Sequence, residues 1–98
     1  MSFEQALNTT LAAAFGDDDA LVMELRSAFL DSARRHVEAM ANAASGAEWC
    51  EAALRLKGLA ASFGATDLMT HADRAAEASQ KTPDLLGGVQ RALAILAL

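Results

Sequence analysis

Four side chains in the sequence could take part in covalent chemistry: His36, His71, Cys50 and Lys57. An imidazole nitrogen can act as a nucleophile or a general base near neutral pH, whereas a cysteine attacks only as a thiolate of lowered pKa. Lys57 is the basic neighbour on the predicted helix face of Cys50, but it is seven residues away, which is weak support for a reactive thiolate. His36 falls within an apolar stripe, which is typical of a core histidine. We therefore expect no catalytic residue.

Other kinds of reactive site are missing from the sequence. We find no carboxylate pair suited to acid–base catalysis, no glycine-rich phosphate loop and no cluster of metal ligands. A single cysteine, Cys50, cannot form an internal disulfide or a zinc site by itself. The sequence therefore predicts a chain without a metal or a cofactor.

Composition and charge favour one helical domain that does not bind nucleic acid. The 98 residues are 53% hydrophobic and 21% charged, which suits a single folded domain over residues 1–98. Alanine, the best helix former, fills 24 positions. Thirteen acidic residues outnumber eight basic ones, and phosphate backbones are bound by Lys and Arg, so a nucleic-acid partner is not expected. The adjacent Arg34 and Arg35 are expected to be a solvated pair or a partner contact.

Membrane insertion and secretion are not expected from the sequence. The longest apolar run, residues 92–98, is much shorter than the roughly 20 residues that a spanning helix needs. The first residues show no basic segment followed by an apolar one, as a signal peptide would. We therefore expect a cytoplasmic protein with no membrane contact.

Start and stop signals divide the chain into helices. Ser45 with Glu48 resembles a capping box, Gly64 is a typical helix stop, and Thr82 before Pro83 is a typical helix start. The predicted helices cover approximately residues 2–16, 18–44, 46–63, 66–80 and 83–98. Short connections between long amphipathic helices make neighbours antiparallel. The fold class is therefore all-α, an antiparallel four-helix bundle with a short extra N-terminal helix.

The helix predicted over residues 46–63 has an unusual outer face. Its core face collects large apolar side chains and alanines, namely Trp49, Ala52, Leu56, Leu59, Ala60 and Phe63. The face opposite this core carries Cys50, Leu54, Lys57, Gly58 and Ala61, which we call the Leu54 strip. Leu54 points almost directly away from the core, beside small residues that would let another backbone approach. We expect this strip to bind a partner, although a single exposed leucine is also normal and the glycine could pack against a loop.

The same helix resembles the signature of histidine-containing phosphotransfer (HPt) domains. The resemblance lies in the segment Leu54-Arg55-Leu56-Lys57-Gly58-Leu59-Ala60 and in Phe63-Gly64-Ala65 with Leu68 after it. Further similar stretches are 15–18, 29–31 and 46–49, so the likeness covers about residues 10–80. The resemblance implies an antiparallel four-helix bundle, in agreement with the helix signals.

The departure from the family pattern is at its phosphorylated histidine, where this sequence has Leu54. Leucine has no lone pair and cannot carry a phosphoryl group. Lys57 matches the family lysine that would balance phosphoryl charge, and Gly58 matches the glycine that lets a receiver domain dock. The resemblance therefore implies a signalling module that cannot be phosphorylated at position 54. It would bind a response-regulator receiver domain or a histidine kinase, as a competitor or modulator.

Two alternatives to this interpretation stay open. His36, at the height of Leu54 on the preceding helix, or His71, at a position that the family usually fills with an apolar residue, could serve an active phosphotransfer protein. The chain could also be a purely structural bundle.

Overall fold

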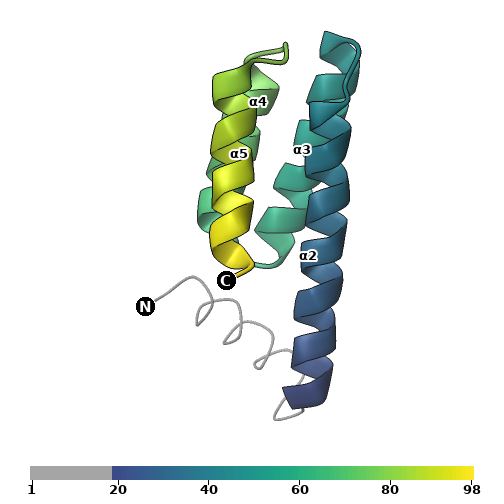
Figure 1. Cartoon of the computed structure of the whole chain (residues 1–98), viewed down its shortest axis with the longest axis vertical. Coiled ribbons are helices and arrows are strands. Elements are labelled where there is room, and N and C mark those ends of the chain that lie inside the picture. Colours follow the sequence, from purple (N-terminus) through teal and green to yellow (C-terminus); the bar gives the residue numbers. More distant parts are fainter. Residues whose placement is uncertain (1–18) are drawn as a thin grey trace.

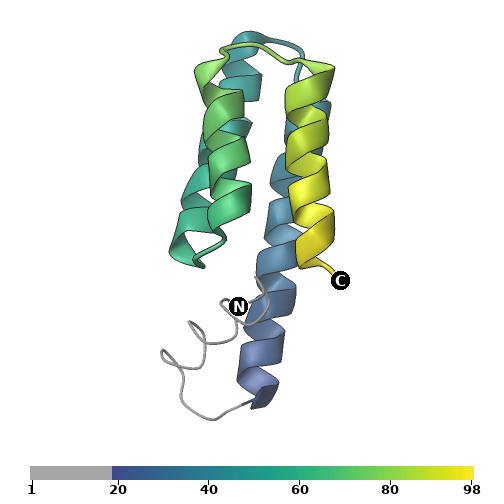
Figure 2. The ribbon, with the colours of Figure 1, turned by 90° about the vertical axis from the view of Figure 1, so that its left-hand side faces the viewer.

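The computed structural model describes residues 19–98 and forms an all-α, antiparallel four-helix bundle (Figure 1). Its helices are α2 (Asp19–Ala41), α3 (Gly46–Ser62), α4 (Thr66–Glu77) and α5 (Pro83–Leu96). The predicted helix over residues 2–16 lies outside the described residues. Each helix runs antiparallel to the next, and the first turns of α2 extend past the lower end of the other three (Figure 2). None of the helices in residues 19–98 is long and apolar enough to cross a membrane.

Local capping starts α3 and α5 where the sequence predicts. The Ser45 hydroxyl oxygen accepts the backbone N–H of Glu48 at 3.1 Å, and the Glu48 carboxylate accepts the N–H of Ala44 at 2.7 Å. The Thr82 hydroxyl oxygen accepts the N–H of Leu85 at 3.3 Å, with proline as the first helical residue. These bonds satisfy backbone donors that have no partner inside a helix, so the predicted caps are confirmed.

Gly64 ends α3 and turns the chain into α4. Its φ of 73° is left-handed, a conformation that glycine adopts without a steric penalty. The N–H of Ala65 donates to the carbonyl of Ala60 at 2.8 Å, and the N–H of Gly64 donates to the carbonyl of Ala61 at 3.2 Å. This pair of bonds is a Schellman motif, so the predicted stop is confirmed with its mechanism.

Two helices end three residues earlier than predicted. We expected α2 to reach Ala44 and α4 to reach Gln80, but they end at Ala41 and Glu77. The Lys81 ammonium group, from the α4–α5 connection, donates to the carbonyl oxygen of Ala41 and satisfies the end of α2. Ser79, with a left-handed φ of 60°, turns the chain away from the helical path after α4. A contact from a distant segment therefore satisfies the end of α2, whereas a left-handed residue close in sequence follows the end of α4.

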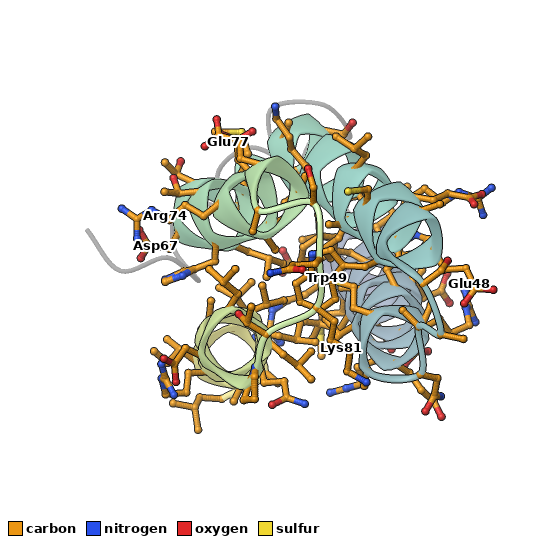
Figure 3. The ribbon with its side chains drawn as sticks, turned by 90° about the horizontal axis from the view of Figure 1, so that it is seen from above. Glu48, Trp49, Asp67, Arg74, Glu77 and Lys81 are labelled. Carbon is orange, nitrogen blue, oxygen red and sulfur yellow. The ribbon has the colours of Figure 1, made fainter. Side chains whose placement is uncertain are left out.

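The core lies along the axis of the bundle. Neighbouring helices pack in the order α2, α3, α4 and α5, and α5 packs back on α2, so that α3 and α5 are diagonal (Figure 3). The largest completely buried side chains are Trp49, Phe29, Met40, Leu56, Leu68 and Val89. Trp49 also satisfies its indole N–H, which donates to the carbonyl oxygen of Ala75 at 2.7 Å.

The predicted core face of α3 is correct at its centre and displaced at its edges. Trp49 and Leu56 are fully buried, as expected. Leu59 and Phe63 are only half-buried, whereas Ala53, which we did not assign to the core, is completely buried. The displacement arises because α3 packs against α4 as well as α2, so its buried face is turned toward α4.

Candidate docking surface

Leu54 lies on the outer face of α3 with 54% of its surface exposed. Gly58 and Ala61, on the next two turns, are also exposed, which confirms the orientation expected from the helical pattern. Apart from the adjoining backbone of α3, no heavy atom of the described residues lies within 4 Å of a Cβ atom built on Gly58. The glycine therefore does not pack against a loop of the bundle. The centre of the Leu54 strip is an apolar side chain beside an open backbone.

Lys57 and Cys50 form the border of the Leu54 strip with α4. The Lys57 ammonium nitrogen lies 2.8 Å from a carboxylate oxygen of Asp73, and both side chains are 41% exposed. The Cys50 thiol is half-buried and donates to the carbonyl oxygen of Ala76 at 3.4 Å. Sequence reasoning placed both residues on the outer face but missed Asp73. No local signal identifies Asp73, since the pairing depends on how α3 and α4 are rotated against each other.

The ion pair determines the charge that Lys57 presents to a partner. The hydrogen bond with Asp73 raises the pKa of the Lys57 ammonium group, and the charges of Asp73 and Glu77 act in the same direction. Lys57 is therefore protonated, but its positive charge is already balanced within the bundle. Asp67 and Arg74 project from the side of α4 that faces away from α3 (Figure 3).

His36 lies in a groove between α2 and α3 and is separated from Leu54 by exposed charged residues. The groove has a volume of about 330 Å³, and its lining residues are His36, Ala39, Asn42, Ala43, Glu48, Glu51, Ala52 and Arg55. Partial burial lowers the pKa of His36, and the charges of Arg55 and Arg35 lower this pKa further. The guanidinium group of Arg55 donates to the carboxylate of Glu51 at 2.7 Å.

His71 belongs to the packing between α4 and α5. A Cβ atom built on Gly88 would lie 3.0 Å from the His71 ring nitrogen Nδ1, so the imidazole packs over this glycine. The residue is half-buried, as a boundary histidine would be. The glycine pair in α5, Gly87 and Gly88, is thus partly explained: the second glycine makes room for a ring. His71 does not reach the Leu54 strip, which lies on the outer face of α3.

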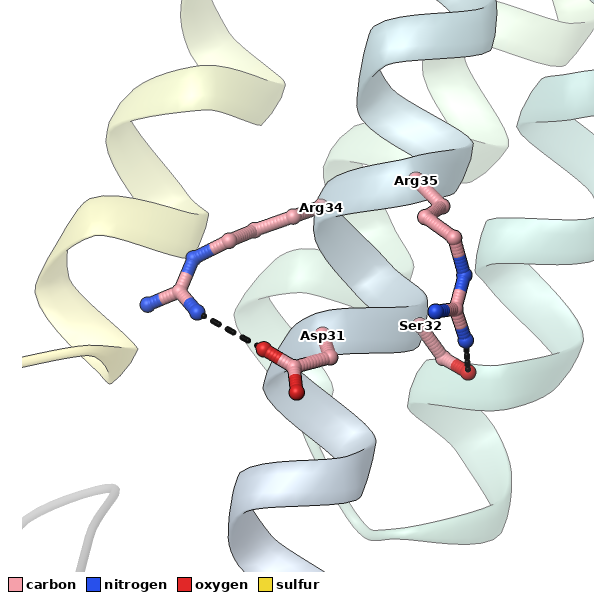
Figure 4. A network of polar contacts seen from close by, with 4 residues as sticks. All are labelled: Asp31, Ser32, Arg34 and Arg35. Atoms are coloured by element: carbon pink, nitrogen blue, oxygen red, sulfur yellow. Dashed lines mark hydrogen bonds and ion pairs between the residues drawn. The ribbon is translucent and has the colours of Figure 1, made fainter.

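The two adjacent arginines of α2 do not converge on a common site. The Arg34 guanidinium group pairs with Asp31 at 3.2 Å, and that of Arg35 donates to the Ser32 hydroxyl oxygen at 3.1 Å. Figure 4 shows the two side chains extending to opposite sides of the helix, Arg34 toward α5 and Arg35 toward α3. Both arginines are exposed and bonded within one turn of α2, so they do not form a joint phosphate-binding site.

Comparison with known proteins adds no family to this picture. No family model, no curated protein and no solved structure matches the chain. Within residues 19–98 no group of three or more His, Cys, Asp and Glu side chains is placed to hold a metal ion. The candidate site is therefore defined by the geometry of α3, and the HPt resemblance stays a prediction from the sequence.

The open space at Gly58 predicts a stabilising substitution. Gly58→Ala should raise the free energy of unfolding by up to about 1 kcal/mol, because alanine is the better helix former and its methyl group enters open space. The matched control Gly46→Ala should lower it by about 1–3 kcal/mol, because the new Cβ would lie 2.5 Å from the backbone oxygen of Ser79. Urea denaturation measures both values. A loss of stability in Gly58→Ala would contradict the open environment described for this residue.

The environment of His36 predicts a loss of stability in acid. Its pKa is lowered from 6.5 in the folded protein, so the unfolded chain binds this proton more readily. The stability that this difference provides is complete above pH 6.5 and is lost as the pH falls through the folded pKa. Urea denaturation between pH 7.5 and about pH 5 should give a shallower acid decline for His36→Gln than for the parent. Identical acid declines in the parent and in His36→Gln would refute the assignment.

Proposed function

We propose that the chain is an HPt-like interaction module that docks a signalling partner on the Leu54 strip and cannot accept a phosphoryl group there. The partner is the receiver domain of a response regulator or, in a second form of the proposal, a histidine kinase. The observation that carries the proposal is the exposed Leu54 beside Gly58, where the helix backbone is open to solvent. The family resemblance of residues 54–68 supports the choice of partner.

The energetics of the strip favour a docking role. A glycine inside a helix costs about 1 kcal/mol relative to alanine, and Gly58 gives no packing contact in return within the described bundle. Without a Cβ atom, the residue lets another backbone approach α3 closely. Burial of a leucine side chain against a partner contributes about 1.5–3 kcal/mol. An apolar residue beside an open glycine therefore suits a contact made between molecules.

The chemistry of position 54 supports a role in binding without transfer. A receiver docked in the manner that the resemblance implies presents its phosphorylatable aspartate to Leu54. Leucine offers no nucleophile to the phosphoryl group, so the complex cannot pass it on. His36 lies in the α2–α3 groove and His71 packs on α5, so neither imidazole is placed beside Leu54. The module then competes with true phosphotransfer proteins for the same receiver.

We predict that the chain takes no label from a phosphorylated receiver. After incubation with a receiver carrying radioactive phosphate, the chain should show no acid-labile, base-stable label, because position 54 lacks a nucleophile. The parent, His36→Ala and His71→Ala should all behave alike in this assay. Stable label on the parent that disappears in one histidine variant would overturn the proposal and favour the phosphotransfer alternative.

We also predict that two substitutions in the Leu54 strip impair receiver binding. Leu54→Asp should weaken receiver binding by about tenfold to a hundredfold, because a charge replaces the buried leucine. Gly58→Gln should block docking sterically while α3 stays folded. Calorimetry with purified receiver domains measures the affinity, and circular dichroism checks the fold.

The diagonal helix α5 offers matched controls for these variants. Ile95 is 64% exposed there, so Ile95→Asp makes a similar chemical change on the far side of the bundle. Ala94→Gln is the control for the added bulk, because Ala94 is exposed on the same helix. Both controls should bind as the parent does. Equal affinity of Leu54→Asp, Gly58→Gln and the parent would place the contact elsewhere, and absence of any partner would favour the structural bundle.

A further inference from the structure

We infer that the Leu54 strip selects the unphosphorylated form of its receiver partner, and that Asp73 on α4 sets this preference. The inference rests on the proposed function, since it takes the strip as the docking surface and the receiver's phosphorylatable aspartate as the group that faces Leu54. Beyond the proposed function, it specifies the phosphorylation state of the receiver that binds, which follows from the charges around Leu54.

The cations that flank Leu54 along α3 are each paired with a carboxylate. Lys57 lies 2.8 Å from Asp73, and Arg55 lies 2.7 Å from Glu51. The charge of Glu77 also acts on Lys57. The positive charge that the family pattern would offer to a phosphoryl group is therefore balanced within this bundle.

A phosphoryl group docked against Leu54 would meet unfavourable surroundings. It carries a charge of about −1.5 to −2 and would lose water against an apolar side chain. If the Lys57 ammonium group turned to it, Asp73 would lose its ion-pair partner beside the new negative charge. Like charges brought together in an interface weaken binding. The bare aspartate of the unphosphorylated receiver is smaller and carries a charge of about −1, so this cost is lower and the unphosphorylated receiver binds more tightly.

This selectivity determines which state of the receiver the module holds. Phosphorylation of the receiver would release it from the Leu54 strip, so the chain would hold receivers in their resting state. Binding and phosphorylation of the receiver are reciprocally coupled. Phosphorylation lowers the affinity of the receiver for the chain, and binding of the chain disfavours the phosphorylated receiver by the same factor. The chain would therefore act as a buffer for resting receivers.

The test uses the full chain and individually purified receiver domains from the genome that encodes it. Calorimetry in Mg²⁺ compares each receiver alone with the same receiver carrying beryllofluoride, a stable mimic of the phosphoryl group. For a receiver that binds the parent chain, beryllofluoride should weaken the affinity at least about tenfold. Leu54→Asp should weaken binding of the bare receiver by about tenfold to a hundredfold.

Two variants of α4 identify the residue responsible. Asp73→Asn removes the carboxylate that holds Lys57 and should reduce the preference for the bare receiver severalfold. The chain stays folded, because an exposed ion pair contributes little to stability. Asp67→Asn makes the same charge change on the side of α4 that faces away from α3 and should leave the preference unchanged.

The outcomes separate this inference from the proposed function. Equal affinity for both receiver states, or tighter binding of the beryllofluoride form, overturns the inference while the docking role stands. A preference that persists unchanged in Asp73→Asn overturns the role of Asp73. If no receiver binds the chain in either state, both the inference and the receiver form of the proposed function fail.

Discussion

Trp49 is completely buried where α3 meets α4, and its indole N–H donates to the carbonyl oxygen of Ala75. Both helices carry small, completely buried residues, among them Ala53 on α3 and Ala72 on α4. Small side chains let the two backbones approach closely, which fixes the rotation of α3 about its own axis. Once that rotation is set, Leu54 has to face outward and Lys57 has to face Asp73. The candidate docking surface is thus a consequence of how α3 packs against α4.

Side chains from distant segments hold both ends of the bundle. At the upper end, the Lys81 ammonium group donates to the carbonyl of Ala41, and Gly46 lies so close to the carbonyl of Ser79 that a side chain would not fit. At the lower end, the Arg26 guanidinium group donates to the carbonyl of Leu96 at 3.0 Å. Cations placed at helix C-termini satisfy carbonyls that have no helical partner and oppose the helix dipole. These contacts support a rigid frame in which α3 presents a fixed outer face.

The outer face of α3 combines an apolar residue with compensated charges. In the proposed function, Leu54 replaces a nucleophile, and the Gly58 backbone remains open for docking. The pairing of Lys57 with Asp73 changes what such a surface can bind, because a lysine already neutralised by a carboxylate offers little to an anion. In that proposal, the leucine in place of a nucleophile and the pairing of Lys57 with Asp73 act in the same direction, toward a surface for the unphosphorylated form of a receiver. The two features together are more consistent with a binding module than either one alone.

The sequence by itself determined the all-α class, the starts of α3 and α5, and the end of α3, because Ser45, Thr82 and Gly64 act on backbone groups within a few residues. It also determined that Leu54 faces outward, since helical periodicity relates it to the buried Trp49 and Leu56. Only the tertiary structure decided which group satisfies the end of α2 and which carboxylate binds Lys57. Lys81 and the Ala41 carbonyl are 40 residues apart, and contacts over such separations depend on the relative rotation and height of packed helices. Periodicity and caps describe one helix at a time, so they leave these relations between helices open.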